Sequence, residues 1–148
     1  ATNGRGFVMF AAQLAFIDNL PNRIEQSFRE TVEEHGLELK EYIVNEQLFE
    51  RGVDGDEKRL EGYKRTTIRY KIAKRQPVDR TTTRDEGIFH AYIDVRAFSD
   101  YFEVTTNVSY DKYILKRYGR NILKVTNANM TQFLNTYFIK NLKRYATQ

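Results

Sequence analysis

The sequence predicts an α+β fold in one domain spanning residues 1–148, with helices toward both ends and an antiparallel β-hairpin between them. Two apolar stripes at helical spacing, over residues 21–50 and about 128–145, predict the long helices. Residues 88–97 and 101–107 alternate apolar with polar side chains across a short gap, which is typical of a hairpin. A chain of 148 residues can bury a core without metal or disulfide support.

An apolar stretch precedes the first long helix. Residues 1–6 hold nothing that can be buried, so a flexible tail is expected there. From Phe7 to Ile17 apolar side chains recur at helical spacing, which fits a short helix or a strand leading into one. The stretch is too short to cross a bilayer and lacks a secretory cleavage pattern, so no membrane contact is expected.

The helix expected over residues 21–50 is marked at both ends. Pro21 suits the first helical position, where a missing N–H costs nothing, and Gly52 suits the stop. Gly36 predicts a kink or break at residues 35–37, because glycine costs about 1 kcal/mol relative to alanine in a helix. The apolar stripe consists of Ile24, Phe28, Val32, Leu39, Ile43 and Leu48.

A second, short helix is expected further along the chain. Either Thr66 or Thr67 can cap it, because a threonine hydroxyl accepts a hydrogen bond from a backbone N–H of the first turn. The helix runs to about Arg75, with Ile68 and Ile72 on its inner face.

Two loops flank this helix, over residues 51–62 and 76–84, and the first holds three glycines. In the second loop, the hydroxyls of Thr81 to Thr83 can bond nearby backbone groups and hold one shape. Asp85-Glu86 is expected to begin a brief helical turn, and Gly87 allows a sharp exit.

The C-terminal third is expected to be mainly helical. Residues 110–118 form a helix that ends at Gly119, and residues 122–125 form a short apolar linker. Thr126 or Asn127 caps the final helix. The inner face of that helix carries Met130, Phe133, Leu134, Tyr137, Phe138 and Leu142.

The chain shows no constellation typical of catalysis or metal binding. It has no cysteine, and its two histidines, His35 and His90, lack metal-ligand spacing. The Asp54-Gly55-Asp56 cluster lacks the ligand spacing of an EF-hand. Adjacent acids such as Asp85-Glu86 usually point apart, whereas general acid–base catalysis needs a defined mutual geometry. We therefore expect a non-enzyme with no cofactor and no metal.

Charge is distributed unevenly along the chain. Residues 1–57 hold 5 Lys/Arg against 12 Asp/Glu, residues 58–84 hold 10 against 2, and residues 85–148 hold 9 against 6. Such asymmetry suggests a partner of opposite sign, either nucleic acid or another copy of the chain. The alternative is that the acidic and basic segments face each other within one monomer, or face water.

The basic segment supplies the candidate contact residues. Its lysines and arginines can meet phosphates, and its tyrosines can stack on unpaired bases. Arginine and tyrosine are also enriched at protein interfaces, and on a short helix the same charges are often only solvated. The candidates are Tyr63, Lys64, Arg65, Arg69, Lys71, Lys74, Arg75, Pro77, Arg80 and Arg84.

Three segments, "LFERGVDGDEKRLEGY", "TTIRYKIAKRQPVDR" and "TTTRDEGIFHAYI", together resemble a known family. It is the tail-completion, or tail-to-head joining, family of virion morphogenesis and neck proteins of tailed bacteriophages. The likeness covers about a third of the chain, and Thr83 and Glu86 depart from the leucine and threonine common in the family. The residues at the compared positions are Leu60, Gly62, Tyr63, Thr67, Ile68, Lys71, Thr83, Asp85, Gly87 and Phe89.

The resemblance implies a structural role without catalytic residues. The expected protein is a subunit of a homo-oligomeric ring in the virion neck, assembled in the host cytoplasm between the portal-side connector and the tail. Its basic segment would contact a neighbouring subunit or, without base specificity, the phosphates of DNA in the channel. The acidic residues 23–57 would face residues 58–84 of a neighbour. The alternative function is a basic nucleic-acid-binding accessory protein.

Overall fold

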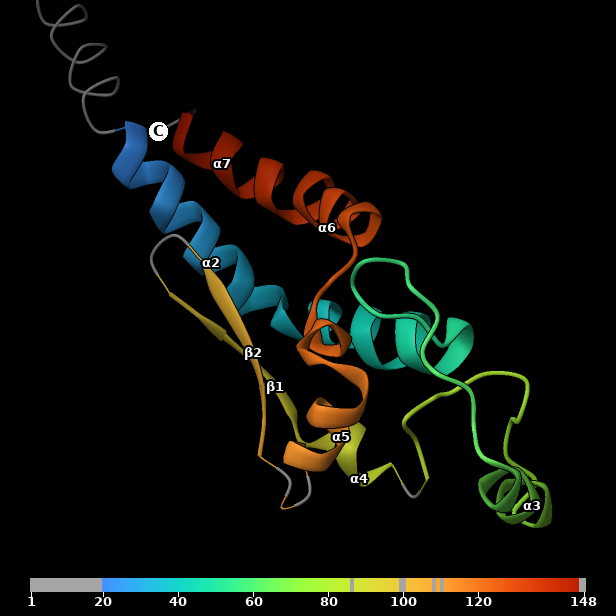
Figure 1. The fold of residues 1–148 in the computed structure, drawn as a ribbon. Coiled ribbons are helices and arrows are strands. Elements are labelled where there is room, and N and C mark those ends of the chain that lie inside the picture. Colours follow the sequence, from blue (N-terminus) through green and yellow to red (C-terminus); the bar gives the residue numbers. More distant parts are fainter. Residues whose placement is uncertain (1–19, 86, 99–100, 108, 110, 147–148) are drawn as a thin grey trace, which may run out of the picture.

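The computed structural model describes residues 20–85, 87–98, 101–107, 109 and 111–146. The tail and the apolar stretch expected before residue 18 lie outside these described residues, as does Glu86. Within them, a long helix, an antiparallel hairpin and a C-terminal helical segment follow in the predicted order (Figure 1). The α+β prediction is therefore confirmed.

The long helix is built from two consecutive segments. An α-helix, α2 (Leu20–Glu41), runs into η1 (Tyr42–Arg51), which continues in wider, π-type turns. His35 leaves helical geometry (φ −123°, ψ 18°) directly before Gly36, so the predicted kink is confirmed. Gly52 ends the helix as predicted, with φ 63° in the left-handed region that favours glycine.

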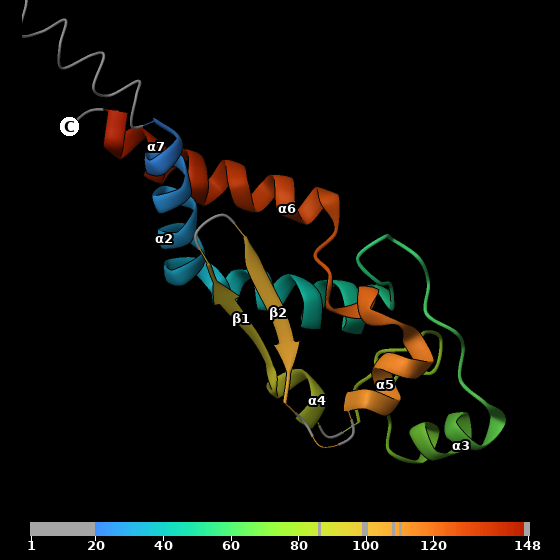
Figure 2. The same ribbon diagram turned by 60° about the vertical axis from the view of Figure 1, so that its left-hand side comes forward.

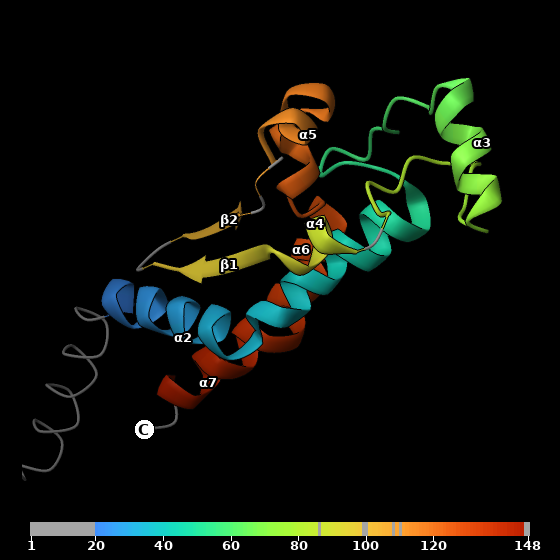
Figure 3. The same ribbon diagram turned by 90° about the horizontal axis from the view of Figure 1, so that it is seen from below.

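The hairpin consists of β1 (Ile93–Ala97) and β2 (Phe102–Thr106), paired antiparallel, and β1 lies along α2 (Figure 3). The expectation that the first strand begins at residue 88 is wrong. A short helix, α4 (Ile88–Ala91), comes first and buries Phe89, which is 2% exposed. Gly87 precedes α4 with φ 82°, so it does provide a sharp turn. Periodicity alone cannot separate a buried helical turn from a buried strand in so short an apolar run.

A helical connection leads from the hairpin to the C-terminal segment. The predicted helix is present as α5 (Asp111–Tyr118), followed by Gly119 with φ 85°. The expected apolar linker is partly a 3-10 turn, η2 (Arg120–Leu123).

The C-terminal segment lies against the long helix. It comprises α6 (Asn127–Phe133), η3 (Leu134–Phe138) and α7 (Ile139–Ala146), with η3 and α7 beside α2 (Figures 1 and 2). Of the two candidate caps, Thr126 is used: its hydroxyl accepts a hydrogen bond from the backbone N–H of Asn129 at 3.2 Å.

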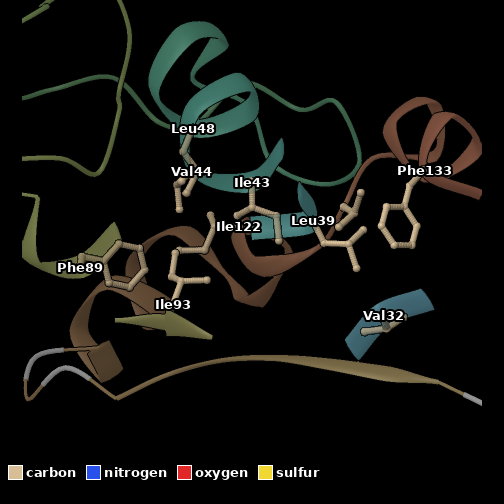
Figure 4. Close-up of a cluster of buried hydrophobic side chains, with 10 residues drawn as sticks. Val32, Leu39, Ile43, Val44, Leu48, Phe89, Ile93, Ile122 and Phe133 are labelled. Carbon is tan, nitrogen blue, oxygen red and sulfur yellow. The ribbon is translucent and has the colours of Figure 1, made fainter. Parts of the chain in front are cut away.

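The hydrophobic core lies where the long helix, the hairpin, η2 and α6 meet (Figure 4). Its members are apolar side chains that segments distant in sequence contribute to one cluster. Phe133 comes from the predicted inner face of the last helix and is fully buried. The cluster contains Val32, Leu39, Ile43, Val44, Leu48, Phe89, Ile93, Ile122, Val125 and Phe133.

Candidate functional site

The basic segment forms an arm that stands away from the core. The short helix α3 (Arg65–Ala73) lies at the periphery of the molecule in all three ribbon views, at the end of the loops over residues 52–64 and 74–84 (Figures 1, 2 and 3). Lys64 is its N-cap residue and makes no side-chain cap bond, so the expectation of a threonine cap is wrong. We call residues 52–85 the arm.

Tyr63 joins the two loops of the arm. Its hydroxyl accepts a hydrogen bond from the backbone N–H of Thr82 at 2.8 Å, and it lies 3.3 Å from the hydroxyl of Thr82. Its ring lies under the ammonium group of Lys71, 4.8 Å from the ring centroid. Tyr63 is therefore engaged inside the arm rather than offered to a partner.

Lys71 is the main correction to the candidate contact residues. It is only 5% exposed and donates hydrogen bonds to Gln76 Oε1 at 3.1 Å and to the carbonyl of Arg84 at 2.9 Å. A buried ammonium is tolerated when carbonyl oxygens replace the lost water. The helix turns its Lys71 side inward, so Ile72 is 60% exposed and the prediction of an inner Ile72 is wrong.

The carboxylate of Asp85 accepts hydrogen bonds from side chains of α3 and of the turn that follows it. It accepts hydrogen bonds from Gln76 Nε2 (3.0 Å), Lys74 Nζ (3.0 Å) and the Tyr70 hydroxyl (3.0 Å). The Gln76 bond, followed by that of Lys74, holds the pKa of Asp85 below its usual range. Hydrogen bonding to Tyr70 and then to Asp85 raises the pKa of Lys74. Asp85 thus anchors α3 to the threonine loop.

Two arginines attach the arm to the end of the long helix. Arg80 Nε donates to the carbonyl of Phe49 at 2.6 Å, and the guanidinium of Arg84 lies 4.8 Å from the centroid of the Phe49 ring. Gly52 lets the chain approach closely here, because an added Cβ would lie 2.9 Å from the carbonyl oxygen of Thr81. Arg80 and Arg84 therefore serve an internal contact.

Hydroxyl bonds fix the threonine loop, as predicted. Thr83 Oγ1 donates to the carbonyl of Thr82 at 2.6 Å, and Thr82 Oγ1 accepts from the backbone N–H of Arg84 at 3.2 Å. Thr81 Oγ1 donates to the carbonyl of Glu61 at 2.5 Å, which ties this loop to the first one.

A buried histidine sits beneath the threonine loop. His90 Nε2 lies 3.0 Å from the carbonyl of Thr82 and 3.0 Å from Thr83 Oγ1. Burial, together with the charges of Arg84 and Lys40, lowers the pKa of His90 to about 4, although its bond to Thr82 opposes the shift. The ring is therefore neutral at pH 7 and is part of the packing of the loop.

Six of the candidate cations are exposed on the arm. Two of them, Lys74 and Arg84, make the internal contacts described above, which leaves four outside those contacts. They are Lys64, Arg65, Arg69 and Arg75. Arg65, Arg69 and the exposed Ile72 share one face of α3, because they are four and three residues apart. Pro77 lies in the loop after α3 and is half-buried. We call Lys64, Arg65, Arg69, Ile72 and Arg75 the basic patch.

An acidic counterpart lies on the outer face of α2. Exposed glutamates surround Leu37, whose side chain is 76% exposed. Glu33 and Glu34 make local, exposed contacts, with Arg29 at 3.9 Å and with His35 at 3.6 Å. Acidic residues further along the chain make closer pairs: Asp56 with Lys124 at 2.5 Å, and Glu57 with Arg51 at 2.6 Å. We call Glu33, Glu34, Leu37, Glu38 and Glu41 the acidic patch.

Three residues that organise these contacts were not singled out from the sequence. Gln76 bonds both Lys71 and Asp85, and Phe49 receives both arginines. Gln47, which is fully buried, bridges the long helix to the C-terminal segment by donating to the carbonyl of Lys124 and accepting from the N–H of Thr126. Their residue types occur on any helix or loop, so the sequence carries no signal for these roles.

Comparisons with family models, curated proteins and solved structures find no match. Within the described residues, no group of three histidine or acidic side chains is placed to hold a metal ion. No helix in that part of the chain combines the length and apolarity needed to span a bilayer.

Asp54 has a structural role in the glycine-rich turn. Its Oδ1 accepts hydrogen bonds from the backbone N–H groups of Asp56 and Lys58, which fixes this turn.

Proposed function

We propose that the protein is a non-catalytic structural subunit of a tailed-phage virion. In this proposal it forms a ring in the neck that joins the portal or connector to the tail. The three quoted segments that resemble tail-completion proteins support this function. The two complementary patches on separate elements support it further, and they are the observation on which the proposal mainly rests.

The two patches are matched in chemistry as well as in charge. Each places one exposed aliphatic side chain, Leu37 or Ile72, among exposed groups of a single sign. The patches lie on α2 and α3, which are well separated in the ribbon views (Figures 1 and 3). Contact between two different surfaces of one subunit is heterologous, and repeated contacts of this kind close into a ring when the rotation permits.

In such a contact the charges and the aliphatic residues do different work. Opposite charges speed encounter and fix the register of the subunits more than they add affinity. Desolvating Leu37 and Ile72 supplies the apolar part, at roughly 25 cal/mol per Å² of surface removed from water. Cations of the basic patch that do not pair with a glutamate of the neighbour can contact phosphates of DNA in the channel, without base specificity.

A charge-swap experiment tests the proposed contact. Arg65→Glu/Arg69→Glu makes the basic patch acidic, and Glu34→Lys/Glu38→Lys makes the acidic patch basic. Wild-type protein is expected to form concentration-dependent oligomers in mass photometry at low salt, and each double variant is expected to stay monomeric. An equimolar mixture of the two variants should oligomerise again, because each reversed patch meets its opposite.

The control places the same change of charge elsewhere on the molecule. Lys112 and Lys116 are exposed cations on α5, outside both patches. Lys112→Glu/Lys116→Glu should assemble as the wild type does. Loss of assembly in this control, or a mixture that fails to regain it, counts against the docking of the two patches.

The alternative function is binding of nucleic acid by a monomeric accessory protein. The observation that favours it is the exposed Tyr70, 48% accessible, on the same helix as the cations Arg65 and Arg69. A salt-titrated binding assay with short DNA discriminates the two functions. Tight binding by a monomer, with a salt slope that falls by about two in Arg65→Glu/Arg69→Glu, favours the accessory protein.

A further inference from the structure

The hairpin leaves an apolar groove open on its β2 side. The groove has a volume of about 730 Å³, and its lining comes mainly from β2 and from the chain between α5 and α6. These elements are labelled in Figure 2. Its lining contains half-buried apolar side chains as well as charged ones. Its apolar lining includes Phe28, Phe102, Val104, Leu115, Leu123 and Met130.

Within the described residues, β2 pairs with β1 alone, so the other edge of β2 has no strand partner there. The backbone N–H of Phe98 donates to the carbonyl of Tyr101 at 2.9 Å, in register with the ladder that pairs Ala97 with Phe102. Hydrogen-bonded and non-hydrogen-bonded pairs alternate in an antiparallel ladder. The backbone groups of Phe102, Val104 and Thr106 therefore point away from β1, toward the open side. Moreover, Thr106 Oγ1 is buried there without a hydrogen-bond partner in the described part of the chain.

We propose that the apolar N-terminal segment of the same chain, Phe7 to Ile17, occupies this groove. Phe7-Val8-Met9-Phe10 pairs with the free edge of β2 as a third, antiparallel strand. The side chains of the segment cover the groove lining, and the backbone groups of β2 gain partners. The segment precedes the described residues, and placing its apolar side chains against the groove removes apolar surface of both from water.

The course of the chain gives the segment its direction. The rings of Phe28 and Phe102 are 6.4 Å apart, and Lys40 Nζ donates to the carbonyl of Ala91 at 2.9 Å, so α2 runs antiparallel to β1. The start of α2 at Leu20 thus lies about 12 Å beyond the level of Phe102, the rise of eight helical residues. A chain that returns from there runs along β2 in the antiparallel sense.

The segment is long enough to reach the whole groove. Thirteen residues, from Phe7 to Asn19, span up to about 43 Å when extended, and the return plus the length of β2 needs about 30 Å. Asp18 and Asn19 are residue types that favour the required turn. A tethered segment is present at an effective concentration in the millimolar range, which favours it over the same segment of a second copy.

The absence of cysteine makes a cross-linking test clean. Met9→Cys/Glu103→Cys places one thiol in the segment and one on β2, and Met9→Cys/Leu37→Cys places the second thiol on the opposite, exposed side of α2. A short bis-maleimide should join the first pair within one molecule at least about tenfold faster than the control pair, as read by mass spectrometry of the monomer. Equal rates in the two pairs, or cross-links only between molecules, overturn the proposal.

Amide hydrogen exchange gives a second, independent readout on the whole chain. The amides of Phe102, Val104 and Thr106 should be protected in the wild type and exchange at least about tenfold faster in Phe7→Asp/Phe10→Asp. The core amides of Leu39 and Ile43 report that this variant is still folded. Edge amides that already exchange freely in the wild type overturn the proposal. The result does not depend on ring formation, because neither charged patch is altered.

Discussion

The core and the arm are held together by different chemistry. In the core, the fully buried side chains are mainly apolar, such as Leu39, Ile43 and Phe133. In the arm, most of the buried side chains are polar, and Val53 is the apolar exception among the described residues. Lys71, Thr81 and Thr82 are buried there, each with hydrogen-bond partners inside the arm. One chain thus uses non-directional apolar burial to build its body and directional hydrogen bonds to shape its extension.

This difference tells us what each region tolerates. Apolar burial depends on volume, so the core should respond to lost methylene groups and to cavities. A hydrogen-bonded arm with few apolar contacts should open locally at lower free energy than the core, and should respond to pH and to single polar atoms. A projecting arm of this kind can present a charged patch without exposing the core.

The largest expected effect is a cavity in the core. Phe133→Ala removes a fully buried ring from the cluster that includes Leu39 and Ile43 and should lower the free energy of unfolding by about 3–5 kcal/mol. Urea unfolding monitored by circular dichroism measures the change. Tyr113→Ala, at a site 66% exposed, is the control and should cost no more than about 0.5 kcal/mol. Similar losses in the two variants would refute the apolar half of the comparison.

The next effect is a pH dependence that originates beneath the arm. The pKa of His90 is about 4 in the folded protein, below the ordinary value near 6.5, so the unfolded chain binds the proton more readily. The contribution is complete above about pH 6.5 and is lost as the pH falls toward 4, by about 2–3 kcal/mol. Urea unfolding between pH 4.5 and 7.5 should show this loss in the wild type.

The matched variant for this effect is His90→Gln, whose amide N–H can donate to the carbonyl of Thr82 but does not titrate. Its free energy of unfolding should vary less with pH over the same range than that of the wild type. An unchanged pH profile in the variant would assign the dependence to other groups.

A smaller effect is expected from one hydroxyl group in the arm. Tyr63→Phe removes the acceptor of the Thr82 N–H and should cost about 1–2 kcal/mol, because that N–H is then left without its partner. The change should appear as faster amide exchange of Thr82 and its neighbours, with the core unaffected. Tyr70→Phe is the control: its hydroxyl donates to Asp85 at an exposed site, so its loss should cost less. Equal effects would mean that burial of the bond is unimportant.

Much of the body could be predicted because its signals are local. Gly52 and Thr126 mark helix ends through backbone geometry that any sequence must obey. The helix α2 already includes Leu20, so Pro21 is not its first residue as predicted. The kink beside Gly36 and the alternation in the hairpin belong to the same class of signal. The helix α4 was not predicted because its four residues are too few to show a helical periodicity of apolar side chains.

The arm was predicted less well because long-range contacts decide it. Composition placed the cations on a short helix but could not tell which of them would be buried. The side chain of Lys71 points inward because it donates hydrogen bonds to Gln76 and to the carbonyl of Arg84. Arg84 is thirteen residues away in the sequence. Arg80 and Arg84 turned to Phe49 for a similar reason. Such partners are set by tertiary packing, which overrides local preference.

The smallest effect contrasts the same substitution in two glycines. Gly36→Ala adds a Cβ that would lie 3.7 Å from Val95 Cγ1, an ordinary contact, and it lowers the entropy of the unfolded chain. It should therefore raise the free energy of unfolding by about 0.5–1 kcal/mol. Gly52→Ala should lower it instead, because φ is 63° and the new Cβ would lie 2.9 Å from the carbonyl oxygen of Thr81. Urea unfolding of the two variants beside the wild type gives the signs. If both variants lose stability, the joint between α2 and β1 is as tightly constrained as the attachment of the arm, and the contrast between the two regions does not extend to their backbones.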